Sequence, residues 1–230
     1  MTQKLDGRVR RRQIAQAALQ VIAQRGLGGL SMAGLARQVG LVPSAIYRHY
    51  RGKEEVLSAA MESIVQKAQA NLQAVCRQTS DPLERIERLL MRQVAMVREI
   101  PAMPRIIFAE GPSGQRKAQA YGMLRGFLGA LADIIRQGQG QGVIRKDVEA
   151  FSLAVMAWGL LAPAVILWYA SEGDFDVTAQ VQRGWKVFAV AIKVNHNSHK
   201  SAGHRLQASG YRLQKNKAKA GGELTPESKT

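Results

Sequence analysis

The chain has 230 residues, 46% of them hydrophobic, and one cysteine. It can therefore bury a substantial core, whereas an internal disulfide and a zinc site built on several thiolates are excluded. The formal net charge is +16 and is concentrated at the ends: 10 basic against 3 acidic residues over 1–60, 15 against 12 over 61–190, and 8 against 2 over 191–230. This distribution favours a polyanionic partner, of which nucleic acid is the commonest, over charge that serves only solubility.

The N-terminal segment is polar and basic, and it lacks the apolar stretch of a signal peptide. Together with the single Cys76, this favours a cytoplasmic location. Apolar residues then recur with the i, i+3, i+4 spacing of an amphipathic helix. These residues are Ile14, Ala17, Ala18, Val21 and Ile22. Gly26 is expected to end this helix. No stretch of the chain shows sustained strand alternation, so we expect an all-α fold.

Two short helices are predicted next. Ser31 can cap the first of them, which Gly40 ends; its apolar face is Met32, Leu35, Ala36 and Val39. Pro43 suits the first turn of the second, where its missing N–H is no loss. Only a few residues around Gly40 separate the two helices, which is the spacing of a helix-turn-helix. The second helix of such a unit can enter the ~12 Å major groove of DNA.

Longer helices are predicted beyond Lys53. Apolar periodicity marks helices around 57–68, 83–97 and 124–135, the second stopped by Pro101 and Pro104 and the third broken by QGQGQG. Two apolar segments follow, at about 148–170 and 176–194. Periodicity fades after His196, where a basic, disordered tail is predicted. The predicted domains are therefore 1–53, 54–195 and the tail 196–230.

The stretch SMAGLARQVGLVPSAIYRHYRGKEEVL, residues 31–57, resembles the DNA-binding signature of the TetR family of bacterial transcriptional regulators. The matching positions are Ser31, Leu35, Ala36, Gly40, Ser44, Ile46, Tyr47, His49, Tyr50, Lys53 and Leu57. The helix over residues 10–26 fits the first helix of the family, and the later helical pattern resembles its variable C-terminal domain. The resemblance implies an N-terminal three-helix helix-turn-helix domain plus a C-terminal helical ligand-binding and dimerisation domain. One position departs from the family: Val42 stands where members often carry a small polar residue, and its side chain can neither cap a helix nor bind a phosphate.

Nine residues are predicted to contact DNA: Ser31, Arg37, Pro43, Ser44, Ala45, Tyr47, Arg48, His49 and Lys53. Ser44 can hydrogen-bond a base edge or a phosphate, the Ala45 methyl suits a thymine methyl, and Arg48 suits guanine O6 and N7. The aromatic and remaining basic members are phosphate candidates, as the resemblance also implies for Tyr47 and His49. Ile46 and Tyr50 are expected to pack inward.

The basic run RVRRR, residues 8–12, could form a minor-groove or phosphate arm. For this run, as for Arg48 and Lys53, a simply solvated surface is the alternative.

The segment FSLAVMAWGLLAPAVILWYA, residues 151–170, carries no charge. A helix-turn-helix that reads a palindrome needs two-fold symmetry, and the family resemblance implies a four-helix interface built from the last two helices of each subunit. We therefore expect a homodimer through 148–170 and 176–194, the second segment using the stripe Val177, Val181, Trp185, Phe188 and Ile192. The apolar run is also long enough to cross a ~30 Å bilayer, so a membrane-anchored DNA-binding protein is the alternative. Gly159 and Pro163, which interrupt the run, argue against it.

Apolar side chains of the middle helices are candidates to line a ligand cavity: Met103, Phe108, Met156, Trp158 and Trp168. Each of them would equally suit plain core or interface. Because no cluster of inward-facing charges is visible, we expect an apolar or amphipathic small-molecule effector.

No cofactor or metal is predicted. The GQGQG at 138–142 lacks the GK[ST] of a phosphate loop, and His196, His199 and His204 lie in the polar tail without a nearby acid or thiol. No Ser-His-Asp or Cys-His arrangement can be argued either, so an enzyme is not expected. The sequence and the resemblance together predict a ligand-responsive regulator, most commonly a repressor, that the effector releases from a palindromic operator in double-stranded DNA.

Overall fold

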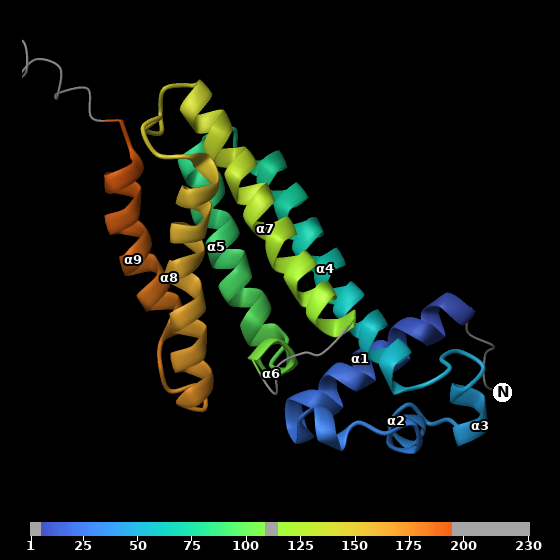
Figure 1. The fold of residues 1–230 in the computed structure, drawn as a ribbon. Helices are drawn as coiled ribbons and strands as arrows, with labels where there is room; N and C mark the ends of the chain where they lie inside the picture. The colour runs from blue at the N-terminus through green and yellow to red at the C-terminus, as the bar shows by residue number, and fades with distance from the viewer. Residues whose placement is uncertain (1–5, 109–114, 195–230) are drawn as a thin grey trace, which may run out of the picture. The chain divides into compact units, whose positions relative to one another are not determined.

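The structure is a computed structural model that describes residues 6–108 and 115–194. This part of the chain is helical, apart from an isolated β-bridge between Ile144 and Lys193, and the predicted all-α fold is confirmed. The predicted tail, 196–230, lies outside it. In chain order the helices (Figure 1) are α1 (Gly7–Arg25), η1 (Leu27–Gly29), α2 (Met32–Gln38), α3 (Pro43–Ile46), α4 (Lys53–Gln78), α5 (Pro82–Glu99), α6 (Ala102–Phe108), α7 (Gln115–Gly140), α8 (Ala150–Ala170) and α9 (Val177–Ile192).

Local signals in the sequence determine the boundaries of the N-terminal helices. The Ser31 hydroxyl accepts a hydrogen bond from the Gly34 N–H at 3.1 Å and so caps α2. Gly26 follows α1 with φ +69° and Gly40 follows α2 with φ +67°, a left-handed conformation that glycine adopts at little cost. Most of the predicted core face is buried, namely Ile14, Ala17, Ala18, Val21, Ile22, Leu35, Ala36, Ile46 and Tyr50. Its other two members, Met32 and Val39, are half-buried.

Helix α4 connects the N-terminal helices to the rest of the chain. Its first turns bury Val56, Leu57 and Ala60, and it packs against α1. The same helix also packs against α5 and α7. The predicted boundary between residues 53 and 54 therefore falls at the start of a continuous helix, and Met1–Lys193 forms one compact unit.

Glycines and prolines interrupt the later helices less than predicted. Pro104 lies in the first turn of α6, where its ring is tolerated, and does not end a helix. Helix α7 continues through Gly138 to Gly140, and the chain then folds back tightly against Gly138. A Cβ on Gly138 would lie 2.6 Å from Ile144 Cδ1. The Gly138 carbonyl accepts hydrogen bonds from the N–H groups of Val143 and Ile144 at 2.9 and 3.1 Å.

Helix α8 is likewise continuous through Gly159 and Pro163, both of which lie on its exposed side. The prediction that Gly159 and Pro163 interrupt this run was therefore wrong, so these two residues do not argue against the membrane alternative. Within the described residues, α8 is the one helix long and apolar enough to cross a membrane. Its 18-residue apolar stretch has a mean hydropathy of 2.1, and 39% of that stretch is buried. Its buried stripe, packed on α7 and α9, comprises Leu153, Ala154, Ala157, Leu161, Ala164 and Val165.

Candidate DNA-binding surface and effector cavity

The recognition helix α3 is short and is held by its apolar side. Ile46 is fully buried and Tyr50 is 2% exposed, whereas Tyr47 is 55% exposed and Ser44 and Arg48 are also exposed. After Ile46 the chain continues as a turn, in which the His49 N–H donates to the Ile46 carbonyl at 3.0 Å. The helix thus presents a polar side while its apolar side packs on the core.

Val42 is the N-cap residue of α3. Its backbone is extended, its side chain makes no capping hydrogen bond, and Pro43 occupies the first turn. The helix start is therefore set by proline geometry rather than by a side-chain cap. Because Val42 is 63% exposed at this end of α3, the surface beside the first turn is apolar where a polar residue was expected.

Arg11 fastens the end of α3 onto α1. Its guanidinium lies 4.2 Å from the centroid of the Tyr50 ring and donates to the His49 carbonyl and, at 3.2 Å, to Glu55 Oε1. In return the Tyr50 hydroxyl donates to the Arg11 carbonyl at 2.9 Å. Burial raises the pKa of Tyr50, and hydrogen bonds from the Arg51 N–H and from Arg11 lower the pKa of Glu55. Arg11 is thus a bridging residue within the run 8–12.

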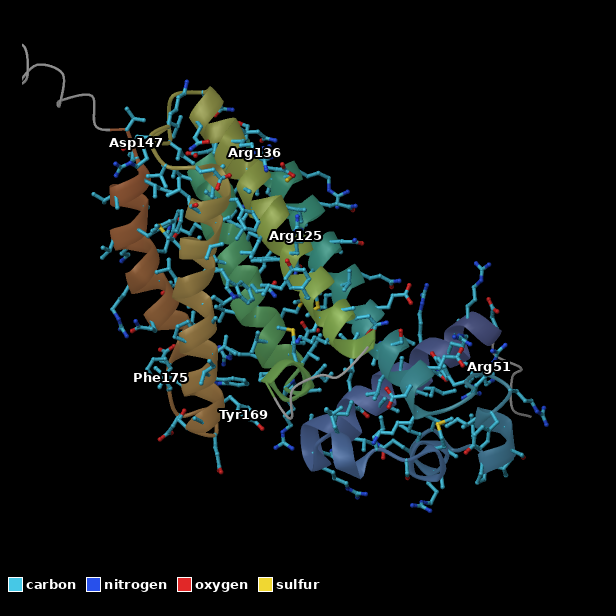
Figure 2. The ribbon with its side chains drawn as sticks, viewed as in Figure 1. Arg51, Arg125, Arg136, Asp147, Tyr169 and Phe175 are labelled. Atoms are coloured by element: carbon cyan, nitrogen blue, oxygen red, sulfur yellow. The ribbon has the colours of Figure 1, made fainter. Side chains whose placement is uncertain are left out.

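Some of the remaining candidates for DNA contact are already hydrogen-bonded within the protein, and others are not. Ser31 Oγ is occupied by its helix cap, and Lys53 Nζ donates to the Leu27 carbonyl at 2.8 Å. Arg37 is exposed and His49 is half-buried. Sequence reasoning missed Arg51, an exposed residue at the turn between α3 and α4 (Figure 2). Its place between Tyr50 and Lys53 in the basic stretch was the available signal.

A cavity of about 850 Å³ lies among α4, α5, α6, α7 and α8, within the usual size range of ligand sites. Its lining is mostly aliphatic and aromatic: Ile64, Val65, Ala68, Gln69, Leu72, Leu89, Gln93, Met96, Met103, Lys117, Ala120, Tyr121, Gly122, Met123, Leu124, Gly126, Phe127, Ala130, Trp158 and Ala162. These lining residues include no Asp or Glu, and Lys117 is the one basic residue among them.

Of the predicted ligand residues, Met103 and Trp158 line this cavity, and Trp158 packs edge-to-face on Phe127 with centroids 5.2 Å apart. Met156 is 54% exposed on another side of α8, and Trp168 is half-buried and not among the lining residues. The structure does not describe the side chain of Phe108, the fifth predicted ligand residue. Periodicity identified the inward faces of the helices, but it could not show which inward residues border empty space.

Two polar features distinguish the cavity wall. Lys117 is exposed and Tyr121 is 62% exposed, so the cavity opens to solvent at the start of α7. The Tyr121 hydroxyl also accepts a hydrogen bond from Arg125 at 3.3 Å, which places a second cation beside Tyr121 (Arg125 is labelled on α7 in Figure 2). Deeper in the wall, Gln93 is only 6% exposed.

The outer sides of α8 and α9 leave large apolar side chains exposed. On α9, Val187 is 74% and Val190 69% exposed; on α8, Ile166 is 47% and Leu167 51% exposed. Phe151, Val155, Met156 and Tyr169 extend the exposed set along α8. We call these eight residues the α8–α9 apolar face.

No metal site is visible in the described part of the chain, where no three His, Cys, Asp or Glu residues gather in a way that could hold an ion. The three predicted tail histidines lie outside that part.

Residues 14–68 match the profile of bacterial regulatory proteins of the tetR family, and residues 58–191 match that of the C-terminal region of YsiA-like proteins. The chain belongs to the TetR family. As a TetR-family member it is a DNA-binding transcriptional regulator.

The regulator PksA of Bacillus subtilis (strain 168) is 25% identical to this TetR-family chain over 176 residues, 72% of this chain and 83% of PksA. The chain spans 54% and 41% of the length of the next two curated relatives that it matches.

Two solved structures show the same fold. FadR from Bacillus subtilis in complex with stearoyl-CoA is 19% identical, with a TM-score of 0.68 over 79% of this chain and 98% of that one. A regulator from Saccharomonospora viridis in complex with choline is 24% identical, with a TM-score of 0.70 over 83% and 97%.

Proposed function

We propose that this regulator is a dimeric repressor that binds a palindromic operator and is released by an amphipathic molecule with a long apolar body and an anionic head, such as a long-chain acyl compound. The cavity carries this proposal, because it is apolar along its length and basic at its opening. Repression is the commoner mode in the family. The proposed role is one of binding, without catalysis.

On the DNA side, the exposed residues of α3 would enter the major groove. Ser44, Ala45 and Arg48 are placed to meet base edges, with Arg48 suited to guanine. Tyr47 and the exposed Arg51 would hold phosphates beside them. His49, Arg37 and Pro43 are proposed as lesser backbone contacts. Ser31 and Lys53, whose polar atoms are occupied within the protein, would act by holding α2 and the start of α4 in place.

On the effector side, the charge of the wall discriminates between ligand classes. Lys117 at the opening attracts an anion, and the described lining residues include no carboxylate that would balance a cation. This favours the chemistry of the stearoyl-CoA bound by Bacillus subtilis FadR over that of the choline bound by the Saccharomonospora viridis protein. The long apolar wall would bury the acyl chain.

The α8–α9 apolar face is proposed as the dimer interface. Eight large apolar side chains that stay exposed in one chain would be buried against the same face of a second copy, in an isologous two-fold contact. A second copy of the chain would cover the exposed apolar side chains of both α8 and the amphipathic α9, whereas a membrane-spanning α8 would cover only its own. We therefore place the protein in the cytoplasm, without membrane attachment. Recovery in the membrane fraction after cell lysis would contradict this.

Release would act through α4. The middle of this helix lines the cavity, and its first turns are packed into the DNA-binding helices. An effector that binds better to one position of α4 than to the other shifts the population of DNA-binding dimers.

The test begins with the operator, selected from random duplex DNA by the purified protein. Octadecanoyl-CoA should raise the Kd for this operator at least tenfold, and choline should leave it unchanged. The Arg48→Ala variant should still bind and be released, but with relaxed preference at one operator position. Release by choline and not by the acyl compound would reject the proposed effector class. A selection that enriches no sequence would reject the operator-binding role.

A further inference from the structure

The Gln93 side chain is the exceptional polar group of the cavity wall. Within the described part of the chain it is the one polar residue classed with the buried core, at 6% exposure. Its neighbours on α5 that also line the cavity are the apolar Leu89 and Met96. A glutamine amide carries two donors and one acceptor oxygen, so this position offers strong hydrogen-bonding capacity in an apolar setting.

The Gln93 amide has no hydrogen-bond partner among the residues that the structure describes. It makes no side-chain hydrogen bond with any described residue, although Arg85 and Arg92 on the same helix do. Among the described residues no side-chain nitrogen or oxygen is sealed from solvent without a partner, so the accessible part of Gln93 must include its amide. Because Gln93 lines the cavity, that amide opens into the cavity.

An unpaired amide at this place is costly unless something else binds it. Leaving a buried polar group unsatisfied costs about 1–3 kcal/mol in proteins in general, so an apolar residue would suit an apolar ligand better. Water can satisfy the amide in the empty cavity, but an apolar chain that displaces the water cannot. A ligand group that hydrogen-bonds to the amide would remove this cost.

The depth of Gln93 can be placed along the helices. Arg85 of α5 donates to Gln137 of α7 at 2.9 Å, so these two positions lie at one level of an antiparallel helix pair (Figure 1). Gln93, eight residues further along α5, then lies near the level of Gly129. Lys117 is twelve residues from Gly129 on α7, which corresponds to about 18 Å at 1.5 Å per residue. Lys117 and the buried Gln93 are thus about 18 Å apart along the cavity wall.

We propose that the effector carries a second oxygen function, a hydroxyl or a ketone, on its apolar body about 18 Å from its anionic head, and that Gln93 recognises this group. The amide can donate to a ketone and can donate to or accept from a hydroxyl. This inference rests on the proposed function, since it presumes that Lys117 holds the head. Sites built to hydrogen-bond a ligand oxygen discriminate strongly against the analogue that lacks it.

The experiment compares three probes: octadecanoic acid, 15-hydroxyoctadecanoic acid, whose hydroxyl in an extended chain lies at that distance from the carboxylate, and 2-hydroxyoctadecanoic acid. Their Kd values are measured from the quenching of tryptophan fluorescence, because Trp158 lines the cavity. The unmodified protein should bind the 15-hydroxy acid about 5–10-fold more tightly than octadecanoic acid, the factor expected for one net hydrogen bond. The 2-hydroxy acid, with its hydroxyl at the head, should show no such gain.

The Gln93→Leu variant keeps the volume of the side chain and removes the amide. It should bind 15-hydroxyoctadecanoic and octadecanoic acid with nearly equal Kd. The matched control is Gln73→Leu, an exposed residue of α4 that does not line the cavity, and it should keep the preference. A preference that survives in Gln93→Leu, or that is missing from the unmodified protein while octadecanoic acid binds, overturns this inference alone. If no probe binds the unmodified protein, the proposed lipid effector fails, and this inference fails with it.

A second readout needs no ligand. Replacing an amide that has no protein partner by leucine should raise the Tm of the free protein or leave it unchanged. A clear fall in Tm for Gln93→Leu would show that the amide supports the fold, and it would overturn the assignment of Gln93 to ligand recognition.

Discussion

Arg11 shows how one basic residue can differ from its neighbours in a charged run. In the segment 8–12 it alone stacks on Tyr50 and hydrogen-bonds to His49 and Glu55, whereas Arg12 is exposed and makes no side-chain hydrogen bond or ion pair with the described residues. The sequence could not separate the two, because Glu55 lies 44 positions away and only the folded chain brings it to Arg11. The first of these side chains therefore serves the fold and the second remains available to DNA.

The two arginines should respond oppositely to truncation. Arg11→Ala should lower the Tm by about 2–4 °C, the shift that about 1 kcal/mol causes in a chain of this size, because the cation–π contact on Tyr50 is lost. Arg12→Ala should leave the Tm unchanged. In DNA binding, Arg12→Ala should reduce the slope of log K against log salt concentration by about 1, and Arg11→Ala should not. Thermal scans and salt titrations measure both effects. A reduced slope in Arg11→Ala with an unchanged Tm would contradict the bridging role.

Residues of the cavity show the same limit of sequence reasoning. Met156 and Trp158 are two positions apart on one helix, and both are large and apolar. The structure places Trp158 on the wall and Met156 on the exposed side, since two residues along a helix turn the side chain through more than half a circle. Gln93 could not be foreseen either, because an isolated glutamine in a helix is usually solvated.

At the scale of elements, prediction succeeded where the signal is local. Ser31, Gly26, Gly40 and Pro43 each act through a cap, a backbone conformation or a missing N–H, and the helices begin and end beside them. Prediction failed where tertiary contacts override local preference. Helix α7 continues through Gly138, where a Cβ would lie 2.6 Å from Ile144 Cδ1, so a tertiary contact rather than the end of a helix accounts for this glycine.

The pairing of α8 and α9 leads to a prediction about assembly. The double variant Val187→Asp, Val190→Asp places two charges on the most exposed part of the α8–α9 apolar face. Burial of unpaired carboxylates is costly, so the dimer should dissociate to a monomer in analytical ultracentrifugation. Operator affinity should fall by at least tenfold, because one half-site alone would then be bound.

Val9→Asp on α1 is the matched control, since Val9 is also exposed but lies away from this face, and it should leave the assembly state unchanged. A double variant that remains dimeric at micromolar concentration would remove α9 from the interface.

For the whole molecule, the charge distribution separates two kinds of DNA binding. The N-terminal sixty residues and the last forty carry most of the net charge of +16, but the DNA-contact candidates lie only in the first group. Base reading by α3 and general attraction to phosphates are therefore proposed to reside in different parts of the chain.

Deletion of residues 201–230 should expose this separation. The truncated protein should bind nonspecific DNA more weakly and with a shallower salt dependence, because basic residues are removed. Its ranking of operator variants should stay the same. Both quantities can be measured by fluorescence anisotropy with specific and random duplexes. A changed ranking would mean that the tail takes part in base reading.

The continuity of α4 has a consequence for the accuracy with which an effector must act. The stretch from Leu72, on the cavity wall, to Lys53, beside the recognition helix, is about 28 Å long at 1.5 Å per residue. Pivoting this rod by about 7° about Leu72 carries Lys53 through about 3.4 Å, which is the rise of one base pair. A bound ligand therefore need not unfold any helix in order to change DNA binding. A small displacement of α4 near Leu72 is therefore enough to shift the DNA-binding helices by one base pair along the double helix.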